Sequence, residues 1–138
     1  MKIKLLLIFI FYFINTAYSQ VAVIANKSVP ISEISASQLL DFYTGDERFW
    51  NDENPVIVFD LKTKGALKET FYKYLGKSSS RMKSIWMKKL LSGEGDPPPA
   101  LESESEMLDK IEKTKGAIGF VNYKSVSKKV KILTIIEQ

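Results

Sequence analysis

Hydrophobic and polar positions follow two different periods along this chain, and the alternation between these periods predicts strands and helices in turn. Short apolar runs predict strands at residues 21–25, 56–59 and 117–121. Residues 130–136 alternate less cleanly and predict an edge strand. Because no polar side chain interrupts residues 56–59, we expect this strand to be covered on both faces and to lie at the centre of the domain.

Four other stretches place apolar side chains three and four positions apart, which is the spacing of an amphipathic helix. Each follows a serine or a glycine, so the helices are expected to begin near Ser35, Gly65, Ser79 and Ser103. The expected core positions on these helices are Leu39, Phe71, Leu75, Ile85, Trp86, Leu90, Leu108 and Ile111. Strands alternating with helices indicate one α/β domain, in which helices flank a parallel or mixed sheet.

The first nineteen residues are expected to lie outside the folded domain. Two lysines near the start precede an apolar run at residues 5–14, and Ala17 and Ser19 are small residues at the two positions that a signal peptidase reads. The run is ten residues long, which is too short to span a bilayer, so a retained membrane anchor is the weaker alternative. We predict a signal peptide at residues 1–19, one domain at residues 20–138, and a periplasmic or secreted location.

The chain contains no histidine and no cysteine, which removes several classes of site. Serine–histidine and cysteine–histidine nucleophiles cannot form, a zinc site would need carboxylates alone, and there is no disulfide framework. We therefore expect no enzyme activity, no catalytic residue, no metal site and no cofactor. The formal charge falls from +4 to +2 when Lys2 and Lys4 are removed, and the remaining lysines are scattered, so no nucleic acid partner is expected.

The turn after residues 56–59 is the candidate binding site. A helix that begins at the carboxyl end of a strand presents unpaired N–H groups and the positive end of its dipole at one point, where an anion can bind. The candidate anion-binding residues are Lys62, Thr63, Lys64, Gly65, Ala66 and Leu67. The alternative is an ordinary turn with solvated lysines. The nearby Glu102, Glu104 and Glu106 lack the glycine turn of a calcium loop and are expected to be a solvated helix start.

Several segments in a fixed order carry a resemblance to a known family. They are VAVIAN, SASQLLDFYTGDERFW, VFDLKTKGALKETFYKYLG and SIWMKKLLSGEGDPPPALESESEMLDKIEKTKGAIGFVNY. Over residues 21–123 the chain resembles the phosphate-binding, type II periplasmic solute-binding protein superfamily, and in particular its small members with a single lobe. The resemblance implies a three-layer-like lobe, with a mixed sheet flanked by helices. It also implies that this chain is the second lobe of the two-lobed proteins, standing alone.

The chain departs from this family at the ligand site. Full-length phosphate binders carry a motif close to Arg-x-Asp-Gly-Ser-Gly-Thr before the central helix, and its side chains contact phosphate. Alignment on the FYKYL helix places Leu61, Thr63, Gly65, Ala66 and Leu67 at the arginine, aspartate, serine, glycine and threonine positions. None of those side-chain ligands is retained, although a small shift of the alignment would put Thr63 or Lys64 in a ligand's place. The helix N-terminus and its lysines remain.

Two functions from different classes are consistent with this pattern. The first is an exported binding module for phosphate or a similar oxyanion, which serves uptake or sensing. The second is an interaction module that kept the fold, lost the ligand, and docks onto a membrane transporter, channel or sensor. For the first, backbone donors and two lysines predict weak binding, on the order of tens of micromolar to millimolar.

Overall fold

The structure is a computed structural model that describes residues 19–137. The signal peptide predicted at residues 1–19 lies outside the described residues, apart from Ser19. A four-stranded sheet in the described part has the order β2, β5, β1, β6. Its strands are β1 (Val21–Ala25), β2 (Ile57–Val58), β5 (Ala117–Asn122) and β6 (Lys131–Ile136). β1 is antiparallel to β5 and β6, whereas β2 is parallel to β5, so the sheet is mixed and β6 is an edge strand, as predicted.

Four α-helices in this part of the chain begin where the sequence predicts. They are α1 (Ala36–Thr44), α2 (Ala66–Tyr74), α3 (Ser79–Leu91) and α4 (Glu104–Lys113), and a short 3-10 helix, Tyr123–Ser125, follows β5. Serine side chains cap α1, α3 and α4: the hydroxyls of Ser35, Ser78 and Ser103 each accept the N–H three residues later. Gly45 ends α1 in the left-handed conformation that glycine adopts most easily.

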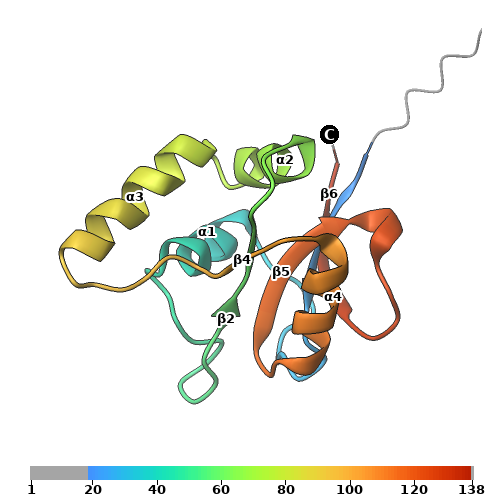
Figure 1. Cartoon of the computed structure of the whole chain (residues 1–138). Coiled ribbons are helices and arrows are strands. Elements are labelled where there is room, and N and C mark those ends of the chain that lie inside the picture. The colour runs from blue at the N-terminus through green and yellow to red at the C-terminus, as the bar shows by residue number, and fades with distance from the viewer. Residues whose placement is uncertain (1–18, 138) are drawn as a thin grey trace, which may run out of the picture.

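Helices cover both faces of the sheet (Figure 1). Gly119 and Phe120 are neighbours in β5, so they face opposite sides of the sheet. α4 packs over Gly119 so closely that an added Cβ would lie 2.4 Å from Met107 Sδ. On the other face the ring of Phe71 in α2 stacks on Phe120 at 3.9 Å, and Tyr43 of α1 packs beside both rings. This three-layer arrangement confirms the predicted fold class.

The strand predicted at residues 56–59 is shorter and less buried than expected. β2 contains two half-buried residues and lies at the edge of the sheet, because only β5 pairs with it. The N–H of Phe59 still donates to Ile118 O at 3.0 Å, but the N–H of Asp60 donates to Pro99 O at 2.9 Å. The chain thus leaves the main sheet after Phe59. It then forms β3 (Asp60–Leu61), which pairs in parallel with β4 (Ala100–Leu101) in a separate two-stranded sheet.

Most of the predicted core positions are confirmed. Leu39, Phe71, Leu75 and Ile111 are buried, and Ile85 and Leu108 pack against the core and stay partly exposed. Trp86 is also partly exposed and packs against the end of α1 at Gly45. The prediction for Leu90 is wrong, because its side chain is 48% exposed. α3 packs mainly on α1 and α2 and not on the sheet. The sheet therefore does not cover the side of α3 that carries Leu90. Within residues 19–137, no helix combines the length and apolar character that crossing a membrane requires.

Candidate anion-binding site

The N-terminus of α2 has no side-chain cap. Its N-cap residue is Gly65, whose backbone is extended and whose first helical hydrogen bond runs from Glu69 N–H to Gly65 O at 3.0 Å. The N–H groups that precede Glu69 in the first turn, those of Ala66, Leu67 and Lys68, have no acceptor within the helix. These donors and the positive end of the helix dipole point toward the same space.

α2 is held rigidly against the sheet, which fixes the position of its N-terminus. Phe71 stacks on Phe120 with an angle of 7° between the rings, and Tyr43 meets Phe71 edge-on at 4.8 Å. The hydroxyl of Tyr43 donates to Phe59 O at 2.8 Å, which joins α1 to the segment that leads into the site. Burial raises the pKa of Tyr43, so this hydroxyl remains a neutral donor.

A pocket of about 340 Å³ lies at the N-terminus of α2 and is also lined by the start of α4. Five of the six predicted site residues line it, namely Thr63, Lys64, Gly65, Ala66 and Leu67. Lys62 does not; it lines a neighbouring groove instead. The opposite wall consists of Glu102, Ser103, Glu104 and Asn122. The sequence pattern did not place these four residues in the site, because no local signal shows that the two helices begin beside the same pocket.

The N-terminus of α4 differs from that of α2 because a side chain caps it. The hydroxyl of Ser103 accepts the N–H of Glu106 at 3.1 Å, and the carboxylate of Glu106 accepts the N–H of Glu102 at 2.9 Å. The carboxylate of Glu104 accepts the backbone N–H of Asn122 at 2.6 Å and the hydroxyl of Ser125 at 3.2 Å. Two of these acidic residues therefore tie the chain together and are not simply a solvated helix start.

The lysines near the pocket are not equally free to bind a ligand. Lys62 forms an exposed ion pair with Glu102 at 2.9 Å, and the hydrogen bond to this carboxylate raises the pKa of Lys62. Lys68 donates to Leu61 O at 2.7 Å and lies 3.6 Å from Asp60 Oδ2. Among the described residues, no ion-pair partner lies within reach of Lys64. Lys64 is therefore the cation of the pocket that remains available to an anion.

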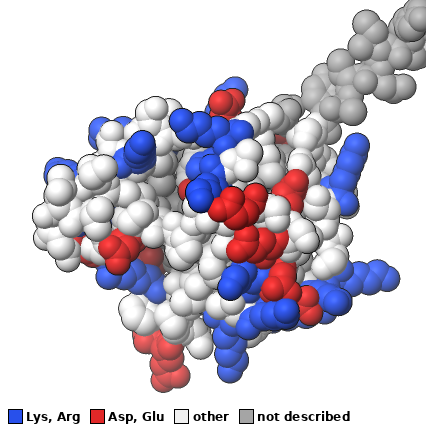
Figure 2. Space-filling model, in the orientation of Figure 1, with Lys and Arg blue, Asp and Glu red and all other residues white. Residues whose placement is uncertain are grey.

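Acidic side chains gather over the start of α4, directly beside lysine side chains (Figure 2). The carboxylates of Glu102 and Glu104 lower the positive potential of the pocket, so they oppose an anion there. No group of three or more carboxylates in residues 19–137 is arranged to hold a metal ion. The pocket thus offers backbone donors and one free lysine against two engaged carboxylates.

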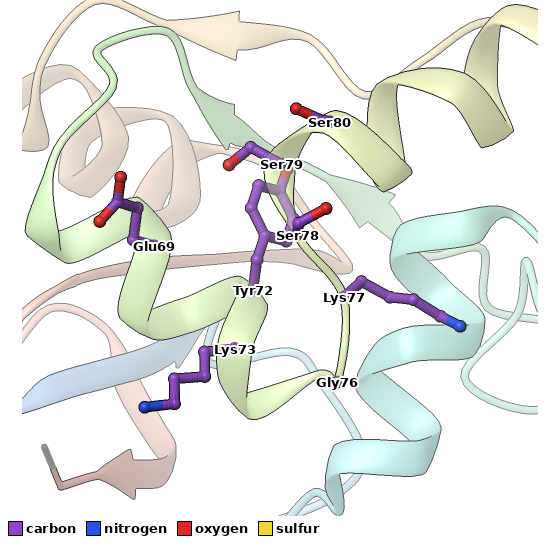
Figure 3. Close-up of a pocket in the computed structure, with 8 residues that line it drawn as sticks. All are labelled: Glu69, Tyr72, Lys73, Gly76, Lys77, Ser78, Ser79 and Ser80. Atoms are coloured by element: carbon purple, nitrogen blue, oxygen red, sulfur yellow. The ribbon is translucent and has the colours of Figure 1, made fainter.

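A larger open hollow, of about 660 Å³, lies between the end of α2 and the start of α3. In Figure 3 the side chains of Lys73 and Lys77 point away from each other, and Glu69 points to a different side again. Only Tyr72 rises toward the serines at the start of α3 (Figure 3). Because its charged groups do not converge, this hollow is a poor candidate for a binding site despite its size.

The fold matches solved structures of phosphate-binding proteins over one part of their length. A protein from Clostridium perfringens, described as a phosphate ABC transporter substrate-binding protein with bound phosphate, matches with a TM-score of 0.68 and 17% identity. An ABC-type phosphate transport receptor from Vibrio cholerae matches with a TM-score of 0.65 and 20% identity. PstS from Borrelia burgdorferi matches with a TM-score of 0.63 and 14% identity.

These matches cover 84% to 85% of this chain, but only 44% to 47% of the three neighbours. The chain therefore has the fold of a single lobe of the phosphate-type substrate-binding proteins, which confirms the predicted resemblance at the level of fold. The neighbours are described as substrate-binding proteins or receptors and not as enzymes. No protein-family model and no curated protein sequence matches the chain.

Proposed function

We propose that this domain binds phosphate or a similar oxyanion at the N-terminus of α2, as an exported solute-binding module in uptake or sensing. The observation that carries the proposal is the uncapped first turn of α2, which opens into a pocket beside the unpaired Lys64. Backbone N–H groups at a helix N-terminus bind anions without help from particular side chains. The fold of phosphate-binding receptors supports the ligand class, and the predicted signal peptide supports export.

The geometry predicts low affinity and low selectivity. A single lysine is a point charge and lacks the fork of donors with which a guanidinium selects phosphate. Glu102 and Glu104 face the same pocket and repel an anion. We therefore expect phosphate and sulfate to compete within about tenfold, which is a difference of roughly 1.4 kcal/mol, and added salt to weaken both.

The test is a phosphate titration of the described domain, followed by NMR chemical shifts of the backbone N–H groups. Shifts that cluster at residues 63–67 and saturate at millimolar phosphate are the expected result. Lys64→Glu should abolish them without lowering stability, because an added carboxylate near the N-terminus favours the dipole of α2. Lys110→Glu, an exposed lysine of α4 away from the pocket, is the charge-matched control and should bind normally.

Absence of shifts at millimolar phosphate would overturn the proposal. The interaction module that docks onto a membrane transporter, channel or sensor would then be the remaining hypothesis. A pattern of equal, small shifts over all lysines would also count against the site, because it would indicate general charge screening and not a bound ion.

A further inference from the structure

A groove of about 380 Å³ adjoins the anion pocket and is bounded by α2, α3 and the segment before β4. We call it the α2–α3 groove. Its wall is mostly apolar and is formed by Met82, Trp86, Met87, Leu90, Pro97 and Pro98. Figure 2 shows the largely uncharged surface over α3, next to lysine side chains near the top of the view. The volume lies in the range of sites that bind small organic ligands.

The apolar wall of the groove is preformed. The indole N–H of Trp86 donates to Tyr43 O at 2.9 Å, and the ring lies so close to Gly45 that a Cβ there would be 2.9 Å from Trp86 Cη2. Opposite this ring, the proline segment is fixed by the hydrogen bond from Asp60 N–H to Pro99 O. The groove therefore does not need to reorganise before an apolar group enters it.

Two apolar side chains of the wall remain exposed to water. Met87 and Leu90 are 49% and 48% exposed, although they lie one helical turn apart beside the partly buried Trp86. Covering such a contiguous apolar surface is favourable, and exposed patches of this kind mark binding sites more often than single exposed residues do.

The charges that line the groove favour an anionic ligand. Asp60 is the sole carboxylate among its lining residues, and it is engaged by the hydroxyl of Tyr72 and by Lys68. Burial and the neighbouring Asp60 raise the pKa of Tyr72, so Tyr72 remains a neutral donor. Lys64 and Lys83 also line the groove, and no described residue forms an ion pair with either.

The net charge of residues 62–91, which include α2 and α3, also favours an anionic ligand. Residues 62–91 contain nine lysines and arginines but one glutamate, a net charge of +8, whereas the whole chain carries +4. The remainder of the chain is therefore net negative, at −4. Of these nine cations, Lys62, Lys64, Lys68 and Lys83 line the groove, and their excess over Asp60 attracts anions and raises their local concentration.

We propose that the anion pocket and the α2–α3 groove bind one ligand, an oxyanion carried on an apolar organic group. The inference rests on the proposed function, because the charged head group takes the place of phosphate at the N-terminus of α2. Lys64 and Lys68 line both spaces and connect them. The apolar group then lies against Trp86, Met87 and Leu90, where it covers their exposed surface.

The test compares phenyl phosphate with inorganic phosphate and with phenol. We expect phenyl phosphate to bind at least about tenfold more tightly than phosphate, because the ring removes apolar surface from water. In protein labelled with ¹³C at the methionine methyl groups, phenyl phosphate should shift Met82 and Met87, and phosphate alone should not. Met107 is buried beneath α4 on the other face of the sheet and is the internal control.

A matched pair of variants distinguishes binding in the α2–α3 groove from nonspecific binding to exposed apolar side chains. Leu90→Ser should reduce the affinity for phenyl phosphate to near that for phosphate, while phosphate binding stays unchanged. Leu91→Ser removes a neighbouring leucine that is 81% exposed but does not line the groove, so it should bind both ligands normally. Equal losses in the two variants would overturn the inference.

The outcomes distinguish the inference from the function on which it rests. Shifts at residues 63–67 with both anions, without added affinity for phenyl phosphate and without shifts at Met82 and Met87, overturn the inference and leave phosphate binding intact. Binding of phenol as strong as that of phenyl phosphate also overturns it, because the head group would then contribute nothing. Absence of shifts at residues 63–67 with either anion overturns the proposed function, and the inference with it.

Discussion

The N-termini of α2 and α4 line the same pocket, but that of α2 has no side-chain cap and that of α4 is capped by Ser103. At α4, the hydroxyl of Ser103 accepts the N–H of Glu106, and the carboxylate of Glu104 binds the end of β5. At α2, Gly65 supplies no side-chain acceptor. Both ends have the same dipole, so the difference lies in whether the side chain of the N-cap residue accepts an N–H of the first turn.

This difference teaches which helix end is structural and which is available. At α4 the carboxylate of Glu104 holds the start of the helix against β5, and the hydroxyl of Ser103 accepts one N–H of the first turn. The donors at α2 stay without an internal partner, at the end of a helix whose position is fixed by aromatic packing. A fixed helix with unused donors is what an anion site requires, because the donors need no rearrangement to meet the ligand.

The largest expected effect comes from removing the anchor of the open helix. Phe71→Ala deletes a fully buried ring that stacks on Phe120, and it should lower the free energy of unfolding by about 3 to 5 kcal/mol. Denaturant unfolding measures this change. Tyr74→Ala, in the same helix but at its exposed side, should cost far less. An unchanged melting temperature for Phe71→Ala would show that α2 is not anchored in this way.

The next effect concerns the carboxylate of Glu104, which links the start of α4 to the end of β5. Glu104→Gln keeps the shape but removes the charge that accepts the N–H of Asn122 and the hydroxyl of Ser125, so it should cost about 1.5 to 3 kcal/mol. It should also strengthen phosphate binding several-fold, because a negative charge leaves the pocket. Glu112→Gln, whose carboxylate lies 4.0 Å from Lys129 in an exposed pair, is the control. Equal stability of the two variants would contradict this role of Glu104.

The cap of α4 should contribute less. Ser103→Ala leaves the N–H of Glu106 without its acceptor and should cost about 1 kcal/mol. Ser105→Ala makes the same chemical change at an exposed position of α4 that is not the N-cap, and it should leave stability nearly unchanged. Thermal unfolding of the two variants side by side measures the cap alone. A Ser103→Ala variant as stable as Ser105→Ala would mean that α4 is held by Glu104 and its packing.

The fold was largely predictable from the sequence because its signals are local. Ser35 and Ser103 cap helices directly. Every residue of the predicted strands 21–25 and 117–121 is buried. The expectation for residues 56–59 was wrong for a physical reason. An apolar run shows that side chains avoid water, but not how many strands are available to pair with it.

The candidate pocket was predictable only on one side. The turn at residues 62–67 carries its own signals, a glycine, two lysines and a helix start, and five of its residues line the pocket. The opposite wall depends on the position of α4 relative to α2. The spacing of Glu102 and Glu104 along the chain does not predict this position. For the same reason Lys62 looked available, although Glu102 lies 2.9 Å from its Nζ, forty residues later in the sequence.

The smallest expected change in stability is also the sharpest test of the comparison between α2 and α4. It gives the N-terminus of α2 a side-chain cap like that of α4. Gly65 has an extended backbone that other residues can adopt, and a Cβ at this position would meet no atom within 4 Å. In Gly65→Asp the new carboxylate can therefore accept the free N–H groups of the first turn and fill the positive end of the dipole.

We expect Gly65→Asp to change the free energy of unfolding by only a few tenths of a kcal/mol, since glycine and aspartate are both good N-cap residues. Phosphate binding should be lost, because a fixed carboxylate occupies the donors and repels the ligand. Gly65→Ala is the control: it adds a Cβ but no acceptor, so it should keep phosphate binding while it lowers stability slightly. Thermal unfolding and a phosphate titration of the two variants give both numbers. If Gly65→Asp bound phosphate as the unmodified chain does, the ligand would not lie at the N-terminus of α2, and the open end of this helix would have no role in binding.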